Sequence, residues 1–335
     1  MRKLASIKKI EEIKLIEGAD KICAYRVGGW WVVDSVTKYK VGDLAVYYEI
    51  DSFLPVRPQF EFLRKSSFKR IGTAEGFRLK TIKLRGQLSQ GLLTPIPDGI
   101  VDPKEGDDLT EALDIVKYEP PIPAQLAGKI KGTFPSFIPK TDETRIQNFE
   151  TDVGFVPVGE RVYVTEKLDG TSFTCYFNNG VFGVCGRNWE LIETNDNSLW
   201  RMANMLELKD KLTKLGKNIA IQGELVGNGI NGNLYGLTDH KLFFFTAYDI
   251  DKGRRLFFDE LEWLLFRLSV PIVPVLEKYG YVLPNENLVD NMLKYAEGKS
   301  ILNMGVDREG VVVRGLEREF SFKAISNTYL LGSKE

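Results

Sequence analysis

The first third of the chain consists of short runs of β-branched and aromatic residues separated by turn-forming residues. The turn signals include the pair Gly28-Gly29 and the stretch 41–43 (Val-Gly-Asp). The pattern predicts six strands, at 5–12, 23–27, 30–36, 44–50, 79–84 and 91–95. Five or six short strands are enough to form a small β-barrel.

The remainder of the chain has a different pattern, in which helices are interspersed among the strands. Strands are predicted at 161–165, 174–177, 219–224, 242–250 and 310–314. Helices are predicted at 198–215 with Gly216 as a C-cap, at 259–268 and at 288–296. This order favours an α+β domain with antiparallel sheets over a doubly wound one.

A proline-rich stretch at 119–124 reads as a semi-rigid connector, and we place a domain boundary near it, between about Ile115 and Lys131. We therefore expect an OB-like nucleic-acid-binding domain over residues 1–120 and a second domain over residues 128–335. For the first domain, an SH3-like barrel fits the strand pattern nearly as well as an OB-fold.

Composition excludes several classes of protein. The 335 residues are 43 % hydrophobic and 27 % charged, as in an ordinary soluble protein, and no apolar run approaches the roughly 20 residues that cross a bilayer. The N-terminus lacks a signal-peptide core, and three scattered cysteines do not form a disulfide framework, so we expect a cytoplasmic protein. A single histidine, His240, and the lack of a Cys-x-x-Cys pair argue against a zinc site. Catalysis must then depend on Lys, Arg and carboxylates.

The net charge of −1 hides a strongly basic segment at 57–85, where nine Lys or Arg residues face only Glu61 and Glu75. Four phenylalanines are interleaved with these charges: Phe60, Phe62, Phe68 and Phe77. Basic and aromatic residues together suit phosphate contacts and base stacking. The alternative is a solvated basic face of a small β domain.

One tetrapeptide, Lys167-Leu-Asp169-Gly170, combines a potential nucleophile, a carboxylate and a turn-making glycine at the end of an apolar strand. A lysine amine is protonated near pH 7, since its ordinary pKa is about 10.4. A metal cation, a second lysine or burial would have to lower that pKa before Lys167 could act as a nucleophile.

Five further stretches follow in order. They are Gly186-Arg187-Asn188, 222–225 with Glu224, 243–250 with Tyr248, 308–314 with Glu309, and 321–326 with Lys323. Together with the Lys167 motif they resemble the nucleotidyl transferase motifs of the covalent nucleotidyltransferase superfamily of DNA ligases, RNA ligases and mRNA capping enzymes. The resemblance covers residues 140–323 and implies an antiparallel-sheet nucleotidyltransferase (adenylyltransferase), ATP-grasp-like ligase domain.

Only 12 residues follow Lys323, whereas DNA ligases and capping enzymes of this superfamily carry an OB domain after the last motif. The layout is similar to that of RNA ligases with an N-terminal OB module. The resemblance thus implies an ATP-dependent RNA ligase that joins 3′-hydroxyl and 5′-phosphate ends in the repair of RNA nicks or breaks. The alternatives are an ATP-dependent DNA ligase and a catalytically inactive nucleic-acid-binding relative.

The resemblance also implies roles for individual residues. Lys167 would form a lysyl-N-AMP intermediate with ATP, and Lys323 would contact the α-phosphate. Mg²⁺ or Mn²⁺ would be held by Asp169, Glu309 and Glu224, mainly through its water shell. Tyr248 would stack on adenine. The other nucleotide contacts would come from Glu166, Arg187, Glu224 and Arg145.

In two respects the prediction is more open. The superfamily has Lys-x-Lys at its last motif, where this chain has Ser321 and Lys323, so that either lysine slot is possible for Lys323. The expected partner is RNA with 3′-hydroxyl and 5′-phosphate ends, in duplex or nicked form, with no membrane and no obligate protein partner.

Overall fold

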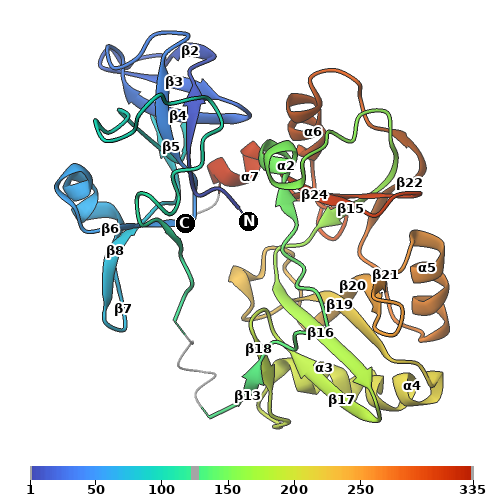
Figure 1. Cartoon of the computed structure of the whole chain (residues 1–335). Helices are drawn as coiled ribbons and strands as arrows, with labels where there is room; N and C mark the ends of the chain where they lie inside the picture. The colour runs from blue at the N-terminus through green and yellow to red at the C-terminus, as the bar shows by residue number, and fades with distance from the viewer. Residues whose placement is uncertain (1, 122–127, 333–335) are drawn as a thin grey trace. The chain divides into compact units, whose positions relative to one another are not determined.

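The computed structural model describes residues 2–121 and 128–332 (Figure 1). Two compact units are present: one contains residues 1–122, 146–156 and 330–335, and the other contains 123–145 and 157–329. The proline-rich stretch at 119–124 lies partly outside the described residues. The predicted domains, 1–120 and 128–335, stay a prediction, and the structure adds that the short segment 146–156 belongs to the first unit.

The first unit consists of small antiparallel sheets. Its strands are β1 (Ala5–Lys9), β2 (Glu12–Leu15), β3 (Ile22–Val27), β4 (Trp30–Ser35), β5 (Leu44–Tyr48), β6 (Ser52–Pro55), β7 (Phe68–Ile71), β8 (Ala74–Arg78), β9 (Thr81–Leu84), β10 (Gln87–Gln90), β11 (Leu92–Thr94) and β12 (Val116–Lys117). They form the sheets β1-β5-β11, β2-β3-β4, β9-β10 and β12-β6-β8-β7. Over the described residues these sheets do not join into one closed ring, so the predicted barrel is OB-like but not closed.

The strand predicted at 5–12 is divided at Ile10, and the hydrogen bonds show why. The Ile10 amide donates to Asp43 O, and the Gly42 amide donates back to Ile10 O. The Glu11 amide then donates to Arg26 O, so the chain leaves β5 and pairs with β3. The single strand predicted at 5–12 therefore supplies strands to two sheets, a division that the residue pattern does not show.

Segment 146–156 contains α2 (Phe149–Val153) and is anchored to the first unit by Asn148. The indole Nε1 of Trp30 donates to Asn148 Oδ1 at 2.7 Å, and Asn148 Nδ2 donates to Glu49 Oε1 at 2.7 Å. Arg2 Nε completes the network with a 2.6 Å bond to Glu49. Because these polar groups are buried, each depends on its partner.

The second unit contains two sheets. Its strands are β13 (Ile130–Thr133), β14 (Thr144–Arg145), β15 (Arg161–Lys167), β16 (Thr171–Asn178), β17 (Val181–Cys185), β18 (Trp189–Leu191), β19 (Ile219–Val226), β20 (Lys241–Asp249), β21 (Arg254–Arg255), β22 (Val275–Val282), β23 (Gly310–Gly315) and β24 (Ser321–Ile325). The strand orders are β13-β18-β17-β16-β19-β20-β21 and β14-β24-β23-β15-β22. Only β14 and β24 pair in parallel among the named strands, which agrees with the predicted antiparallel α+β domain.

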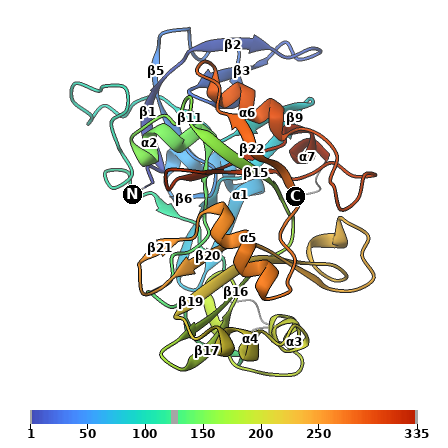
Figure 2. The ribbon, with the colours of Figure 1, turned by 90° about the vertical axis from the view of Figure 1, so that its right-hand side faces the viewer.

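The helices of this unit are α3 (Ser198–Met205), α4 (Leu208–Leu215), α5 (Phe258–Arg267), α6 (Leu288–Ala296) and α7 (Asn327–Gly332), the last of which ends in the first unit. Helices α3, α4 and α5 lie beside the seven-stranded sheet (Figure 2). Their apolar side chains pack with that sheet in one core. The prediction of a single helix at 198–215 is wrong. The helix is interrupted between α3 and α4, where Glu207 adopts a left-handed conformation with φ of 53°. Gly216 does cap α4, with φ of 66°. Within the described residues no helix is both long and apolar enough to span a bilayer.

Candidate active site

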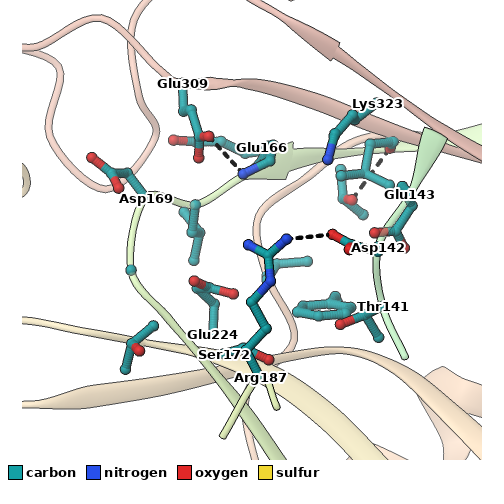
Figure 3. A pocket seen from close by; sticks show the side chains of 18 of the residues that line it. Thr141, Asp142, Glu143, Glu166, Asp169, Ser172, Arg187, Glu224, Glu309 and Lys323 are labelled. Carbon is teal, nitrogen blue, oxygen red and sulfur yellow. Dashed lines mark hydrogen bonds and ion pairs between the residues drawn. The ribbon is translucent and has the colours of Figure 1, made fainter. Parts of the chain in front are cut away.

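A pocket of about 360 Å³ lies in the second unit and collects most of the predicted site residues (Figure 3). Its lining includes Lys167, Asp169, Glu166, Arg187, Glu224, Glu309 and Lys323. These residues come from both sheets, and 157 positions separate the first of them, Glu166, from the last, Lys323. The ordered motifs of the sequence therefore meet at one place.

Lys167 and Glu309 form a close ion pair in this pocket. Lys167 ends β15 opposite Gly310, so the residue before Gly310 is brought beside it, and Lys167 Nζ lies 2.6 Å from Glu309 Oε1. Gly310 is needed for the close pairing of β23 with β24, because a Cβ there would lie 2.2 Å from Ala324 O. Burial alone would lower the pKa of Lys167, but the negative charges of Glu309, Glu224 and Asp169 outweigh it and raise the pKa.

Glu224, on β19, is the second carboxylate of the pocket. Burial raises its pKa to about 8, and the nearby charges of Glu309 and Asp169 act in the same direction, while Lys167 opposes them. The charges of Glu309 and Asp169 thus act with burial against ionisation of Glu224 in the metal-free pocket. A cation is the obvious complement to such a site.

Asp169 is held by three polar neighbours. Its Oδ1 accepts a 3.0 Å hydrogen bond from Asn231 Nδ2, and its Oδ2 accepts a 2.7 Å bond from the Tyr329 hydroxyl. The backbone N–H of Asp169 donates to the Tyr235 hydroxyl at 2.6 Å. The carboxylate is thus oriented before any ligand binds.

Lys323 reaches the same pocket from β24, where it lies opposite Val312 (Figure 3). Burial lowers its pKa to about 8, and the positive charges of Lys167 and Arg145 lower it further. It remains predominantly cationic at pH 7 and can contact a phosphate. Arg145 pairs with Lys323 in the parallel register of β14 and β24 but is not among the residues that line the pocket.

The donor set fits a divalent cation held through water. Glu309 Oε2 is buried without a hydrogen-bond partner, as expected of a group that awaits a ligand. Across residues 2–121 and 128–332, however, no three His, Cys, Asp or Glu side chains form a group that could hold an ion directly. Mg²⁺ keeps several of its waters in proteins, so Asp169, Glu224 and Glu309 suit its outer shell.

Two of the residues predicted from sequence to contact the nucleotide, Glu166 and Arg187, differ in their exposure to solvent. Glu166 is buried, accepts the Ile301 N–H at Oε2 over 2.8 Å, and has no partner at Oε1. Arg187 is exposed and forms a 2.8 Å ion pair with Asp142, also in the pocket lining. Both residues are therefore available to a ligand, one inside the pocket and one at its edge.

Phe245, not Tyr248, is the aromatic residue of β20 that lines the pocket. Tyr248 instead packs with a cluster that contains Ile138 and Tyr176. On β19 the neighbours Gln222 and Gly223 pair with Thr246 and Phe244, so Phe245 is the extra residue of a β-bulge. The signal in the sequence was Gly223, since a glycine inside a strand often marks a bulge.

Arg314 and Glu143 are pocket residues that the sequence reasoning missed. Arg314 Nη2 donates to Glu143 Oε1 at 2.7 Å, and both side chains are nearly buried. The Arg314 guanidinium carbon lies 5.4 Å from the centre of the Phe245 ring. This pair supports the aromatic wall of the pocket, and no motif in the sequence connects the two residues.

Comparison with known proteins agrees with this site. A family model described as an OB-fold domain matches residues 4–96, and one described as RNA ligase matches residues 160–325. The structure of Naegleria gruberi RNA ligase with PPi is 41 % identical, covers 98 % of each chain and superposes with a TM-score of 0.83. A lysine-to-methionine variant of that ligase, with AMP and Mn, is 42 % identical, covers 99 % of each chain and has a TM-score of 0.86. This chain belongs to the RNA ligase family.

A lysine-to-alanine variant of the Naegleria ligase, with ATP and Mn, is 41 % identical over 99 % of each chain, with a TM-score of 0.86. The relatives therefore hold the cofactors expected for this RNA ligase, a nucleotide and a divalent metal. The predicted family, the OB-fold followed by a ligase domain, and the enzyme class are confirmed. Because the chain belongs to the RNA ligase family, the alternative of a DNA ligase is not supported. No curated protein matches the chain.

Proposed function

We propose that this RNA ligase joins RNA 3′-hydroxyl and 5′-phosphate ends through a covalent AMP on Lys167. The neutral amine of Lys167 attacks the α-phosphorus of ATP, a P–N bond forms, and pyrophosphate leaves with the electrons of the broken P–O bond. The RNA 5′-phosphate then takes the AMP from Lys167, and the 3′-hydroxyl finally displaces AMP. The observation that carries this proposal is the meeting of Lys167, Glu309 and Lys323 in one pocket.

All three steps are phosphoryl transfers, so the protein must position the reactants and neutralise the negative charge that spreads over the phosphate. Lys323 is the cation of this chain that would contact the α-phosphate. Asp169, Glu224 and Glu309 would hold a divalent cation through its waters, and that cation would supply positive charge to the phosphates and lower the pKa of Lys167.

The base and ribose are assigned to the remaining lining residues. Phe245 would stack on adenine, supported from behind by Arg314, and Glu166 has a free buried carboxylate oxygen for a polar contact. Arg187 lies where it can contact the nucleotide or the RNA 5′-phosphate. Arg145 would act indirectly, through its neighbour Lys323.

Incubation with ATP labelled on the α-phosphate, in Mg²⁺ or Mn²⁺, tests the first step. The wild type is expected to take up acid-stable label, and Lys167→Ala is expected to take up none. Lys278→Ala serves as the matched control, since Lys278 is paired with Glu262 in the same unit and does not line the pocket. Equal labelling of the wild type and Lys167→Ala would refute the proposal.

The basic segment 57–85 supports the second part of the proposal, that the first unit grips duplex or nicked RNA. Phe60 and Phe77 are buried in the core of this unit and are not available to stack on bases, whereas Phe62 is 65 % exposed. Several of the basic side chains are exposed, among them Lys65, Lys69 and Lys80. Contacts to phosphates are therefore expected to dominate over stacking.

Charge substitutions in the full-length chain test this role better than deletion of the first unit, because segment 146–156 packs with that unit. The triple variant Lys65→Ala, Lys69→Ala and Lys80→Ala is expected to retain lysyl-AMP formation but to bind nicked RNA more weakly, with a reduced salt dependence. A triple variant of three other lysines of this unit, Lys9, Lys21 and Lys40, is the control. Equal sealing and binding by both variants would contradict the RNA-gripping role.

A cytoplasmic location remains part of the proposal. It is supported by the three cysteines, Cys23, Cys175 and Cys185, which are all buried and free. Fractionation of cells that express the tagged protein would test it, and recovery from an oxidising compartment would contradict it.

A further inference from the structure

The carboxylate of Asp169 receives a hydrogen bond from a residue beyond the last nucleotidyltransferase motif. Tyr329, on the short helix α7, donates its hydroxyl hydrogen to Asp169 Oδ2 at 2.7 Å. Asn231 donates to the other oxygen, Oδ1, and also to Gly170 O at 2.6 Å. With one donor on each oxygen, the carboxylate cannot rotate freely about its terminal bond.

Tyr329 is itself held in place by Glu297, which follows α6. Glu297 Oε1 accepts the Asn327 N–H at 2.7 Å, and Glu297 Oε2 accepts the Ser326 hydroxyl at 2.8 Å. The Ser326 hydroxyl oxygen in turn accepts the Tyr329 N–H at 3.0 Å. The start of α7 is therefore fixed by a carboxylate at its N-terminus, a favourable arrangement for a helix. The tyrosine side chain is aimed at Asp169 as a result.

The backbone at Asp169 is fixed as well. Its N–H donates to the hydroxyl of Tyr235, which is buried, with only 4 % of its surface exposed. The position of the residue and the orientation of its side chain thus depend on different neighbours. Of these neighbours only Asn231 lines the pocket, so Tyr235 and Tyr329 act from behind the carboxylate.

We propose that Tyr329 is a positioning residue of the ligase, which orients Asp169 toward the water shell of the divalent cation. This inference rests on the proposed function, because it assigns Asp169 to that cation. An ionised carboxylate has about four lone-pair sites, so the bonds from Tyr329 and Asn231 leave others of Asp169 for the metal waters. Residues that orient metal-binding groups in this way typically change metal affinity or activity by about 10-fold to 100-fold when they are substituted.

The test compares full-length Tyr329→Phe with Tyr279→Phe, which removes the hydroxyl of another tyrosine of the same unit, one that donates to Asp259. The first readout is binding: Mn²⁺ is titrated against thermal stability in the presence of an ATP analogue with a non-cleavable α–β bridge. In Tyr329→Phe the Mn²⁺ midpoint is expected to rise about 10-fold. Tyr279→Phe is expected to match the wild type.

The second readout is the rate of label transfer to Lys167. Tyr329→Phe is expected to lose about 10-fold at limiting Mn²⁺ and to recover at saturating Mn²⁺, with the KM for ATP unchanged. A merely structural role for Tyr329 would not produce a defect that Mn²⁺ rescues. Asn231→Ala is expected to behave in the same way, and because Asn231 is exposed, its loss keeps the test valid if Tyr329→Phe fails to fold.

An unchanged Mn²⁺ midpoint in Tyr329→Phe, or in Asn231→Ala where Tyr329→Phe does not fold, would overturn the positioning role, as would an equal defect in Tyr279→Phe. Failure of the proposed function is a separate result, since it would appear as a wild type without acid-stable label. The Mn²⁺ titration does not depend on labelling, so it tests the role of Tyr329 whether or not the wild type takes up label.

Discussion

Lys167 Nζ lies 2.6 Å from Glu309 Oε1, although 142 positions separate the two residues in the chain. The contact follows from the pairing of β15 with β23, which places Lys167 opposite Gly310. It has a chemical consequence. The charges of Glu309, Glu224 and Asp169 raise the pKa of Lys167 despite its burial, so the metal-free lysine keeps its proton.

Replacing Glu309 with Gln is expected to make Lys167 of the metal-free protein more reactive. Loss of the adjacent negative charge lowers the pKa of Lys167, so a larger fraction of neutral amine is present at a given pH. Acylation by an amine-reactive reagent at pH 8, followed by mass spectrometry of the Lys167 peptide, measures this. Glu262→Gln, which removes the partner of Lys278, is the control and should leave Lys167 unchanged. A slower or equal reaction in Glu309→Gln would show that this carboxylate does not retain the proton.

Lys323 is expected to limit ATP binding at alkaline pH. With a pKa of about 8, its charged fraction falls about 10-fold between pH 7 and pH 9, and affinity for an ATP analogue should fall by a similar factor. Lys323→Arg stays charged and should show a smaller loss of affinity over this range. Lys140→Arg, at another lysine of the pocket lining, controls for the substitution itself. Parallel pH profiles for the wild type and Lys323→Arg would contradict a phosphate contact by Lys323.

Substitutions of Phe245 and Tyr248 are expected to have different effects, the first on ATP binding and the second on stability. Phe245→Leu keeps an apolar side chain in the pocket but removes the aromatic ring, and the Kd for ATP should rise about 10-fold through the loss of stacking. Tyr248→Leu should lower the melting temperature through the cluster with Ile138 and Tyr176, while leaving ATP affinity nearly unchanged. Calorimetric binding and thermal unfolding of both variants decide the matter, and the reverse pattern would assign the stacking role to Tyr248.

Glu224 is expected to destabilise the metal-free protein as the pH rises. Its pKa is about 8 in the fold and 4.5 for the ordinary group, so the folded state binds more protons between these values and loses stability with increasing pH. For one proton the slope is at most about 1.4 kcal/mol per pH unit. Glu224→Gln has no such titration, so its advantage over the wild type should grow from pH 5 to pH 8. A constant difference in unfolding free energy over this range would contradict a raised pKa.

Asn148 is expected to stabilise the first unit without a role in chemistry. Asn148→Ala leaves the Trp30 indole N–H and Glu49 without their buried partner, at a cost of about 1–3 kcal/mol. Formation of lysyl-AMP at low temperature should remain. Chemical denaturation measures the first effect and ATP labelling the second, and a variant that is fully stable would show that segment 146–156 is not anchored by this residue.

The carboxylates of the proposed metal site show how much the motifs could predict. The resemblance of the ordered motifs implied that Asp169, Glu224 and Glu309 share one site. The structure brings them to one pocket, as predicted. It also shows that Glu309 is bound to Lys167 and Asp169 to Tyr329, contacts that join residues outside any common motif.

The position of Phe245 in the pocket could not be predicted from the sequence. A period of two residues predicts which side chains of β20 share a face, but the bulge at Phe245 shifts that period partway along the strand. Bulges depend on pairing with a neighbouring strand, which in this case is β19. The choice between Phe245 and Tyr248 could therefore not be made from the apolar run alone.

The sequence by itself determined the element types, the order of a β-rich OB-like domain before a ligase domain, and the chemical identity of the lysine and carboxylates of the site. The element types follow from local patterns, because periodicity and turn residues act over a few residues, whereas the ligase domain and its site residues were implied by the resemblance of the ordered motifs. Only the tertiary structure decided which groups touch: the Lys167–Glu309 pair, the Asp169–Tyr329 bond, and the association of segment 146–156 with the first unit. Such contacts depend on strand register and on packing between distant segments, which no local pattern specifies.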